Sequence, residues 1–187
     1  MASNLLYGPI YQLKITLRES KPPIWRRLQV REDMTLSKPH QTLQMAMGWT
    51  NSHLHQFVVG SACFGEPYPE ADFDPIDERR VRLWQIVQRP KDKFIYEYDF
   101  GDGWTHEVVV EQFLPAESSV HYPRCLSGRR QCPPEDVGGF GGYAHFLQAI
   151  QDEAHPEHDE YLAWIGGPFD PDAFDVEAVN HALKRIR

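Results

Sequence analysis

The sequence predicts an α+β fold: a mixed or antiparallel sheet, one helix after the first hairpin, and a helical C-terminal part. Three observations lead to this expectation. Alternating polar and apolar residues dominate the first 114 positions, one helical pattern interrupts them near residues 35–48, and apolar stripes at helical spacing follow residue 143. The length of 187 residues is that of one domain. We expect a single domain over residues 1–187, with a strand-rich part (about 8–114), a long loop (115–142) and a helical part (143–187).

The composition is that of a globular protein. With 41% hydrophobic, 25% charged and 12% aromatic residues, the chain is neither disordered nor fibrous. Its apolar runs fall far short of the roughly 18–20 residues of a membrane span, and its first residues lack the pattern of a signal peptide. The three cysteines Cys63, Cys125 and Cys132 are irregularly spaced and fit reduced thiols. We therefore expect a cytoplasmic protein that does not associate with membranes.

The first elements are a hairpin and a helix. Residues 11–18 and 25–30 alternate with period two around Pro22 and Pro23, which predicts two strands and a connecting loop. Residues 35–39 supply a helix cap and a first-turn proline, and Gly48 ends the helix. A strand over about 53–60, an acidic loop over 65–78 and a strand over 81–87 are expected next.

A second hairpin joins residues 94–100 to 104–110. A two-residue turn would mix apolar and charged side chains on each face of the sheet. A three-residue turn, Gly101 to Gly103, makes one face nearly all apolar, so burial favours it. That face contains Phe94, Tyr96, Tyr98, Phe100, Trp104, His106, Val108 and Val110. Glu97 and Glu107 should then be exposed, and His106 should lie on the core side near Tyr98.

Residues 115–142 form a long segment rich in proline and glycine. Segments of this length are usually functional loops or disordered links, and we expect an ordered loop anchored by Tyr122, Phe140 and Tyr143. Helices are then predicted over 143–153, 158–165 and 176–186, where apolar residues recur at helical spacing.

The charge is unevenly distributed. The whole net charge of -8 lies in the last 57 residues, and no Lys or Arg occurs between Arg130 and Lys184. We do not expect an acidic chain to bind nucleic acid non-specifically, and its acidic stretch favours a protein partner with a basic surface. The chain has one local basic patch, and its simplest interpretation is a surface exposed to solvent. It consists of Arg79, Arg80, Arg82, Arg89, Lys91 and Lys93.

The chemical candidates centre on two histidines. On a strand, His53 and His55 would project to the same face and could chelate a divalent metal, the only cofactor that the sequence indicates. A third ligand could come from Asp99, Asp102 or His106, which are also the candidate catalytic residues. The alternative is that one histidine packs in the core and the other is exposed. The aspartates could equally accept backbone hydrogen bonds at the turn.

Five blocks of sequence carry a family resemblance. They contain Trp25, Arg26, Trp49, His53, His55, Tyr98, Asp99, Gly101, Asp102, Trp104, His106, Cys125, Cys132, Pro133, Pro134, Glu135, Asp136, Gly138, Gly139 and Tyr143. In these blocks the chain resembles the plasmid Ri ORF-three-like family, some members of which are labelled insertion-element passenger TnpR proteins. The resemblance implies an association with plasmids or mobile elements but no established activity. The sequence does not support a recombinase, because the chain has no basic terminal segment that could bind DNA.

Two functions from different classes remain. The first is a binding or accessory module that uses the acidic C-terminal region or the glycine-rich loop. The second is a metal-assisted hydrolase or nuclease-like enzyme built on His53, His55 and the hairpin residues Asp99, Asp102 and His106. We favour the first, because no complete catalytic set can be assembled from the sequence.

Overall fold

The computed structural model describes residues 8–67 and 75–186, and it confirms the α+β fold. The strands are β1 (Ile10–Leu17), β2 (Trp25–Arg31), β3 (His55–Val59), β4 (Ala62–Gly65), β5 (Ile76–Asp77), β6 (Lys93–Tyr98), β7 (Trp104–Leu114) and β8 (Arg124–Arg129). The helices are α1 (Ser37–Met47), η1 (Glu78–Arg80), α2 (Leu83–Ile86), α3 (Gly139–Gln151), α4 (His158–Ile165) and α5 (Val176–Leu183).

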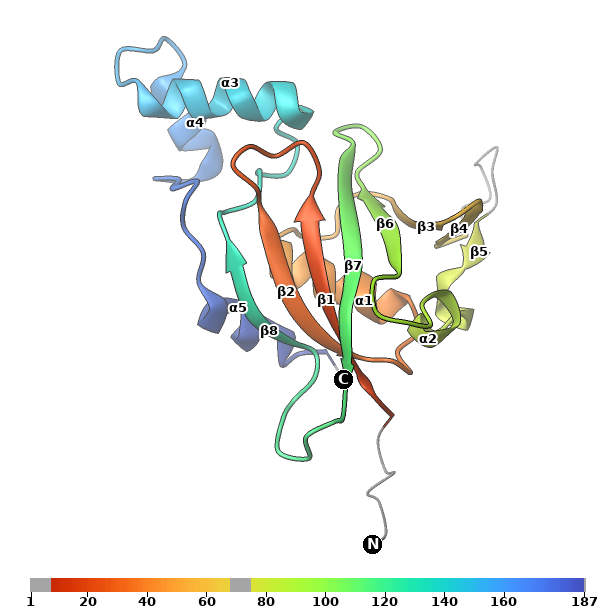
Figure 1. Ribbon diagram of the computed structural model, residues 1–187. Helices are drawn as coiled ribbons and strands as arrows, with labels where there is room; N and C mark the ends of the chain where they lie inside the picture. Colours follow the sequence, from red (N-terminus) through yellow and green to blue (C-terminus); the bar gives the residue numbers. More distant parts are fainter. Residues whose placement is uncertain (1–7, 68–74, 187) are drawn as a thin grey trace, which may run out of the picture.

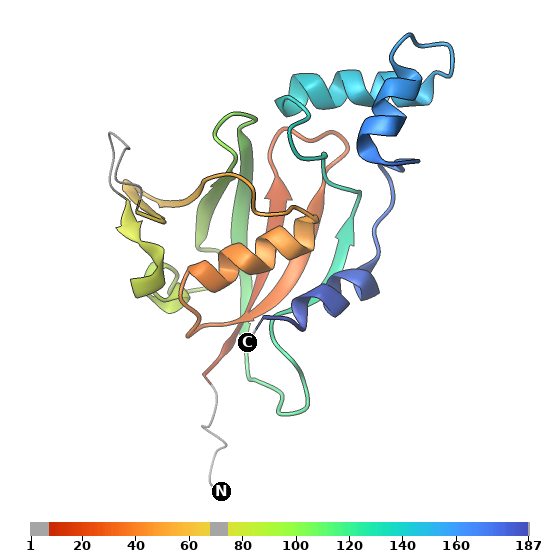
Figure 2. The ribbon, with the colours of Figure 1, turned by 180° about the vertical axis from the view of Figure 1, so that it is seen from behind.

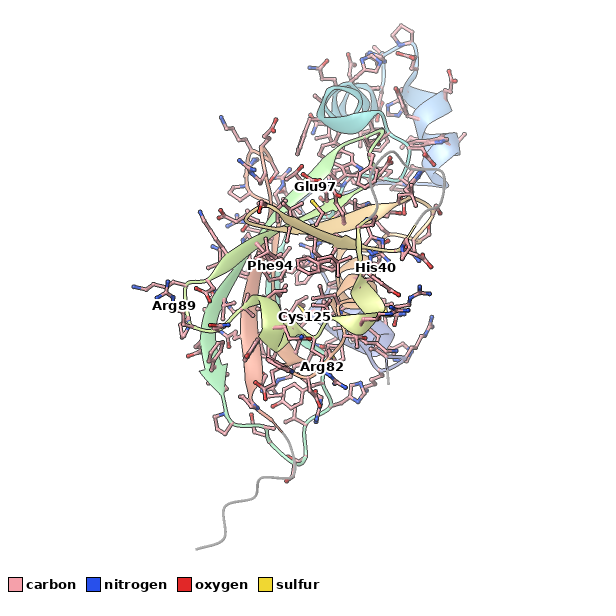
Figure 3. The ribbon with its side chains drawn as sticks, turned by 90° about the vertical axis from the view of Figure 1, so that its right-hand side faces the viewer. His40, Arg82, Arg89, Phe94, Glu97 and Cys125 are labelled. Carbon is pink, nitrogen blue, oxygen red and sulfur yellow. The ribbon has the colours of Figure 1, made fainter. Side chains whose placement is uncertain are left out.

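One mixed sheet organises the described residues, in the order β5-β4-β3-β6-β7-β1-β2-β8. The strand β1 is central and pairs antiparallel with β2 and β7, whereas β4 and β5 are parallel. Helix α1 crosses one face of the sheet, with α5 beside it on β8 (Figure 2). Alternate residues of β1, such as Leu13 and Ile15, are buried on this face. Figure 3 shows Phe94 and His40 in this interior and Arg89 projecting from it.

The second hairpin has the predicted faces but a longer turn. Tyr96, Trp104 and Val108 are buried, and Glu107 lies on the opposite, partly exposed face. However, Tyr98 pairs with Trp104 and Tyr96 with His106, so the turn has five residues, 99–103, and not three. The shift by two residues preserves the faces, and the apolar pattern therefore cannot detect it. The expectation that Phe100 shares the buried face was wrong, since it is 55% exposed in the turn.

Other segments also differ from the sequence prediction, which contained neither β4 nor β5. Residues 81–87 contain the short helix α2 and not a strand, because Leu83 and Val87, one helical turn apart, are both buried, while Trp84 is exposed. The segment 115–142 contains the edge strand β8, which pairs with β2. Its sequence, RCLSGR, has few residues with β-propensity, so the pairing partner decides its conformation.

The C-terminal helices lie beside the sheet. Helix α4 has the predicted bounds, α5 begins as predicted, and α3 begins four residues earlier than predicted, within the glycine-rich segment. Figure 1 shows α3 and α4 beyond one end of the sheet, above the turn between β1 and β2. Within the described part of the chain, every helix is too short or too polar to cross a membrane.

A glycine turn starts α3. Gly138 and Gly139 both have left-handed backbone conformations, with φ of 89° and 66°. A Cβ atom on Gly139 would lie 2.8 Å from the carbonyl oxygen of Asp102, and one on Gly142 would overlap the carbonyl oxygen of Val137. The close approach of three backbone segments therefore requires glycine at these positions.

The side chain of Arg26 joins the sheet to three other segments. It is 2% exposed and has no carboxylate among the partners described. Its Nε donates to the carbonyl oxygen of Ala46 at the end of α1 (2.7 Å), and its Nη1 donates to that of Arg129 at the end of β8 (3.0 Å). Its Nη2 approaches the Sγ of Cys132, and Phe174 stacks on the guanidinium. The carbonyl oxygens at a helix C-terminus carry partial negative charge, which favours this buried cation.

We expect Arg26→Met to lower the free energy of unfolding by about 3 kcal/mol, because it leaves buried carbonyl oxygens without donors. The neighbouring substitution Arg27→Met is the matched control. Arg27 pairs with Glu111 on the open face, and its loss should cost at most about 1 kcal/mol. Urea unfolding of both variants tests this, and equal losses would contradict the role assigned to Arg26.

The start of α3 offers a second comparison. Gly142→Ala should destabilise the fold by about 1–3 kcal/mol, because the new methyl group overlaps the backbone of Val137. Gly141→Ala meets no atom within 4 Å and should stabilise the helix by up to about 1 kcal/mol. Thermal unfolding of the two variants measures the difference, and a Gly142→Ala variant as stable as the wild type would show that the turn is not tightly packed.

Candidate functional site

Three carboxylates surround the imidazole of His53. The Nε2 of His53 lies 3.0 Å from Oδ1 of Asp136, 3.6 Å from Oδ2 of Asp99 and 3.9 Å from Oε2 of Glu135. His53 precedes β3, Asp99 begins the turn after β6, and the other two acids follow β8. We call these four residues the His53 cluster. It joins segments that are far apart in the sequence.

Asp99 uses its two carboxylate oxygens for different purposes. Its Oδ1 accepts hydrogen bonds from the backbone N–H groups of Gly101 (2.9 Å) and Asp102 (3.2 Å), which stabilise the turn. Its Oδ2 faces His53. The side chain is only 8% exposed, so both oxygens are held in place. The turn role and a ligand role, considered as alternatives from the sequence, are therefore compatible.

Glu135 is fixed by neighbouring donors. Its Oε1 accepts from the backbone N–H of Thr50 (2.7 Å) and from the hydroxyl of Tyr98 (3.0 Å). Burial and the carboxylate of Glu135 raise the pKa of Tyr98, so its phenol stays protonated and continues to donate. Glu135 thus contributes a second oriented carboxylate beside His53.

The backbone around the cluster is strained. Asn51, Asp99 and Asp136 have left-handed conformations, with φ of 58°, 57° and 57°. Asn and Asp tolerate this region best among residues other than glycine, yet each such residue still costs free energy. Strained residues of this kind concentrate at functional sites.

The cluster has the ligands of a divalent cation. Ligand atoms of His53, Asp99 and Asp136 all lie within 4.8 Å of one another. The Nε2 of His53 is buried and makes no hydrogen bond of acceptable geometry, despite its acidic neighbours. One imidazole with carboxylates suits manganese, iron or zinc better than calcium, which prefers oxygen ligands alone.

His55 does not join this cluster. The two histidines were expected to project to the same face of a strand, but β3 begins only at His55. The Nε2 of His55 instead lies 2.8 Å from Oε2 of Glu78, and both side chains are buried. The ring of His40 stacks on that of His55 at 3.4 Å. Burial and the proximity of His55 lower the pKa of His40 to about 3, so His40 is neutral.

His53 and His55 nevertheless line the same cavity, which has a volume of about 400 Å³. His53 lies in its wall together with Ser52 and the pair formed by His55 and Glu78. A further cavity of about 490 Å³ reaches Glu135 and Asp136 from the side of Trp49 and α4. Two carboxylates of the His53 cluster, Glu135 and Asp136, are therefore accessible to small molecules, whereas Asp99 is buried.

The remaining candidates lie elsewhere. His106 is fully buried, its Nδ1 lies 3.2 Å from the carbonyl oxygen of Tyr96, and burial lowers its pKa to about 4. It is a neutral core residue. Asp102 accepts a hydrogen bond from the N–H of Gly138 (3.1 Å) and so ties the hairpin turn to the glycine turn. Burial raises the pKa of Cys125 and of Cys132 to about 11, which leaves them as thiols.

Of three other residues in the five blocks, Trp49 positions the site, whereas Trp25 and Tyr143 lie away from it. Trp49 stacks on Tyr98 and donates from Nε1 to the carbonyl oxygen of Pro133 (3.0 Å), which places the segment that carries Glu135. Trp25 lies on the open face of the sheet, beside Lys14 and Arg27. Tyr143 faces a separate cavity below α3.

Sequence reasoning missed three contributors: Glu78, Asn51 and Thr50. Glu78 lies in an acidic segment with no motif, Thr50 acts through a hydrogen bond to Glu135, 85 positions away, and Asn51 acts through one to His40. It also missed a second group of ligating atoms within 4.8 Å of one another, in His145, His155 and Glu157 near the end of α3.

Comparisons with known proteins agree with the fold. The model of the family described as plasmid pRiA4b ORF-3-like protein matches residues 9–178. Uncharacterized protein y4hQ of Sinorhizobium fredii is 43% identical over 180 residues, which cover 95% of this chain and 92% of that protein. The crystal structure of MM3350 from Methanosarcina mazei Go1, a protein of unknown function, superimposes with a TM-score of 0.81 at 34% identity, over 91% of this chain and 97% of that one. The chain therefore belongs to the plasmid pRiA4b ORF-3-like family.

Proposed function

We propose that the protein is a metal-dependent hydrolase of small molecules that binds a divalent cation through His53, Asp99 and Asp136. One observation carries the proposal: an imidazole nitrogen and carboxylates from separate segments converge, with His53 in the wall of a cavity of about 400 Å³ and Asp136 in the wall of another of about 490 Å³. A divalent cation bound by such ligands polarises a carbonyl or phosphoryl group and lowers the pKa of bound water toward neutrality.

The cavity offers a second chemical group. The pair formed by His55 and Glu78 lines the same cavity as His53. A molecule held by the cation would therefore also meet a hydrogen-bonded imidazole that can exchange a proton with it. Glu135 holds the cluster in place through Thr50 and Tyr98.

The charges of the cavity favour a small substrate over a nucleic acid. Its lining includes Glu66 and Glu78, and Arg79, which also lines it, is paired with Asp77. Such a wall repels a phosphate backbone. The nuclease form of the enzyme hypothesis is therefore less well supported than hydrolysis of a small molecule.

Cation binding is measurable by calorimetry and thermal unfolding. In a His145→Ala background, which removes the second group of ligands, we expect Mn²⁺ to bind at one site per chain and to raise Tm. His53→Ala and Asp99→Asn should each abolish both effects, because each removes a ligand. The amide oxygen of Asn can still accept the hydrogen bond of Gly101, so Asp99→Asn preserves the turn.

Two variants serve as controls for this measurement. His181→Ala changes an exposed histidine of α5, and His55→Gln changes the cavity wall outside the cluster. Both should bind Mn²⁺ as the wild type does. Unchanged Mn²⁺ binding by His53→Ala would exclude the site.

Hydrolysis provides a separate test. We expect Mn²⁺-dependent cleavage of p-nitrophenyl acetate or bis-p-nitrophenyl phosphate by the wild type and none by His53→Ala. His55→Gln should lower the rate by about 100-fold or more while it keeps the cation, because a proton-transfer group is lost. Activity that does not depend on the cation, or is equal in His55→Gln, would contradict this assignment.

A second candidate, a binding or accessory module linked to plasmids or mobile elements, is supported by the charge distribution. Residues 131–187 carry three Lys or Arg against eleven Asp or Glu. A partner with a basic surface would complement this region. Nucleic acid is a poor match, because Arg79, Arg89 and Lys93 of the basic patch pair with neighbouring acids.

Salt dependence distinguishes these partners. We expect no measurable affinity for random duplex DNA at physiological salt, and we expect association with a basic protein partner to weaken as salt rises. Fluorescence titration with labelled duplex tests the first expectation. Sub-micromolar binding of the duplex would contradict it and would favour a DNA-linked function.

A further inference from the structure

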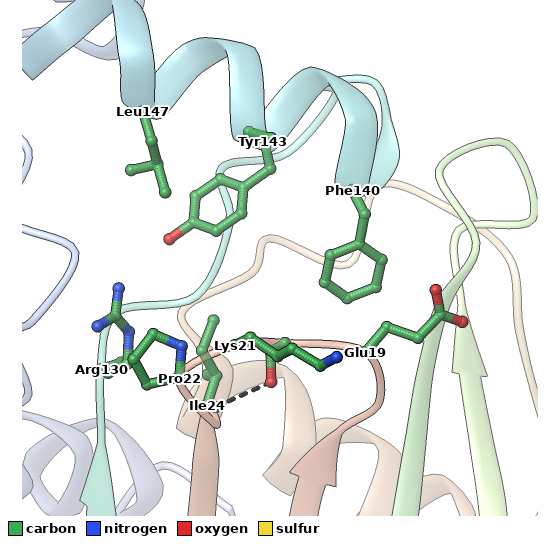
Figure 4. A pocket seen from close by; sticks show the side chains of 10 residues that line it. Glu19, Lys21, Pro22, Ile24, Arg130, Phe140, Tyr143 and Leu147 are labelled. Carbon is green, nitrogen blue, oxygen red and sulfur yellow. Dashed lines mark hydrogen bonds between the residues drawn. The ribbon is translucent and has the colours of Figure 1, made fainter.

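A separate cavity of about 290 Å³ lies between the turn that joins β1 to β2 and the underside of α3 (Figure 4). It shares no lining residue with the cavity of His53. Phe140, Tyr143 and Leu147 project from α3 toward Lys21 and Pro22 of the turn, as Figure 4 shows. Residues at this spacing share one face of a helix, so α3 presents an apolar and aromatic roof to the turn.

Two buried polar atoms at this cavity have no hydrogen-bond partner. They are the hydroxyl of Tyr143, a residue that is 7% exposed, and the Nε of Arg130. Burial raises the pKa of Tyr143 to about 12, and the nearby guanidinium of Arg130 opposes this rise without meeting the geometry of a hydrogen bond. Tyr143 is therefore protonated and can donate. The hydroxyl of Tyr143 and the guanidinium of Arg130 thus lie near one another, and neither that hydroxyl nor the Nε of Arg130 has a hydrogen-bond partner of acceptable geometry.

Two other polar groups of the wall are already engaged, and the charged side chains of Glu19 and Lys21 also line it. Ser20 donates to the carbonyl oxygen of Leu17 and accepts from the N–H of Ile24, the contact drawn in Figure 4. The Nη1 of Arg130 pairs with Asp172, an exposed carboxylate. Arg130 is also held in a left-handed conformation, with φ of 70°, a strain of the kind that accompanies functional sites. Among the buried polar atoms of the wall, those without a partner are thus the hydroxyl of Tyr143 and the Nε of Arg130.

We propose that this cavity binds a small carboxylate with an apolar body, such as an aromatic acid. A carboxylate supplies the two acceptor oxygens that the hydroxyl of Tyr143 and the Nε of Arg130 lack, and a charged acceptor makes these hydrogen bonds strong. Phe140, Leu147, Ile24 and Pro22 would contact the apolar body. The volume lies near the lower end of the range for ligand pockets, which favours a small molecule.

Titration with benzoate tests the proposal, followed by two-dimensional NMR of the backbone amides of the full chain. We expect shifts for residues 20–24, 130 and 140–147. Tyr143→Phe should weaken benzoate binding by about tenfold or more, because it removes one donor and keeps the ring. Tyr161→Phe on α4 is the matched control and should bind benzoate normally.

The stability of the Tyr143→Phe variant without ligand is a second measurement. Tyr143→Phe should be at least as stable as the wild type in urea, since it removes a buried hydroxyl that has no partner. His53→Ala should bind benzoate normally, which separates this site from the proposed hydrolase. Absence of benzoate shifts, equal binding by Tyr143→Phe, or a loss of its stability would each overturn the proposal. Binding of phenyl phosphate or inorganic phosphate but not benzoate would overturn the choice of a carboxylate.

Discussion

The buried guanidinium of Arg26 is the interaction on which the rest of the structure depends. It lies on the inner face of β2 and hydrogen-bonds to the ends of α1 and β8 at once. A buried cation needs several acceptors, and the carbonyl oxygens at the end of α1 supply partial negative charge without a carboxylate. The chain that follows β8 is thereby fixed against the sheet. This chain carries Glu135 and Asp136 to His53, so the candidate metal site depends on a contact made in the core.

The hairpin turn at Asp99 shows how stability and function share one side chain. One carboxylate oxygen completes a strained turn, and the other faces an imidazole. The glycine turn at Gly138 is joined to the same hairpin through Asp102, so a hydrogen bond links the two acidic segments directly. A site assembled from turns that brace each other is preorganised, and binding of a cation would need little rearrangement.

The two cavities differ in chemistry. The cavity of His53 is lined by histidines and acids, which suits a cation and the molecules that it activates. The cavity below α3 is lined largely by aromatic and aliphatic side chains, together with the hydroxyl of Tyr143 and the Nε of Arg130, which have no hydrogen-bond partner of acceptable geometry; this suits an anion with an apolar body. Helix α3 begins at the glycine turn that positions Asp136 and then forms the roof of the second cavity. The two sites are therefore joined by one continuous segment.

The sequence by itself determined the fold class, the faces of both hairpins and the position of α4, because burial selects residues with a period of two in strands and 3.6 in helices. It did not determine the register of the hairpin at Asp99, since a shift of two residues leaves the faces unchanged. It indicated His53 and Asp99 as possible ligands of one metal. It also indicated His55 as a ligand beside His53, but His55 faces Glu78 instead. Only the tertiary structure placed Glu135 and Asp136 beside His53, because the edge strand β8 and the buried Arg26 set the path of that segment. Contacts between residues some 80 positions apart leave no periodic signal in the sequence.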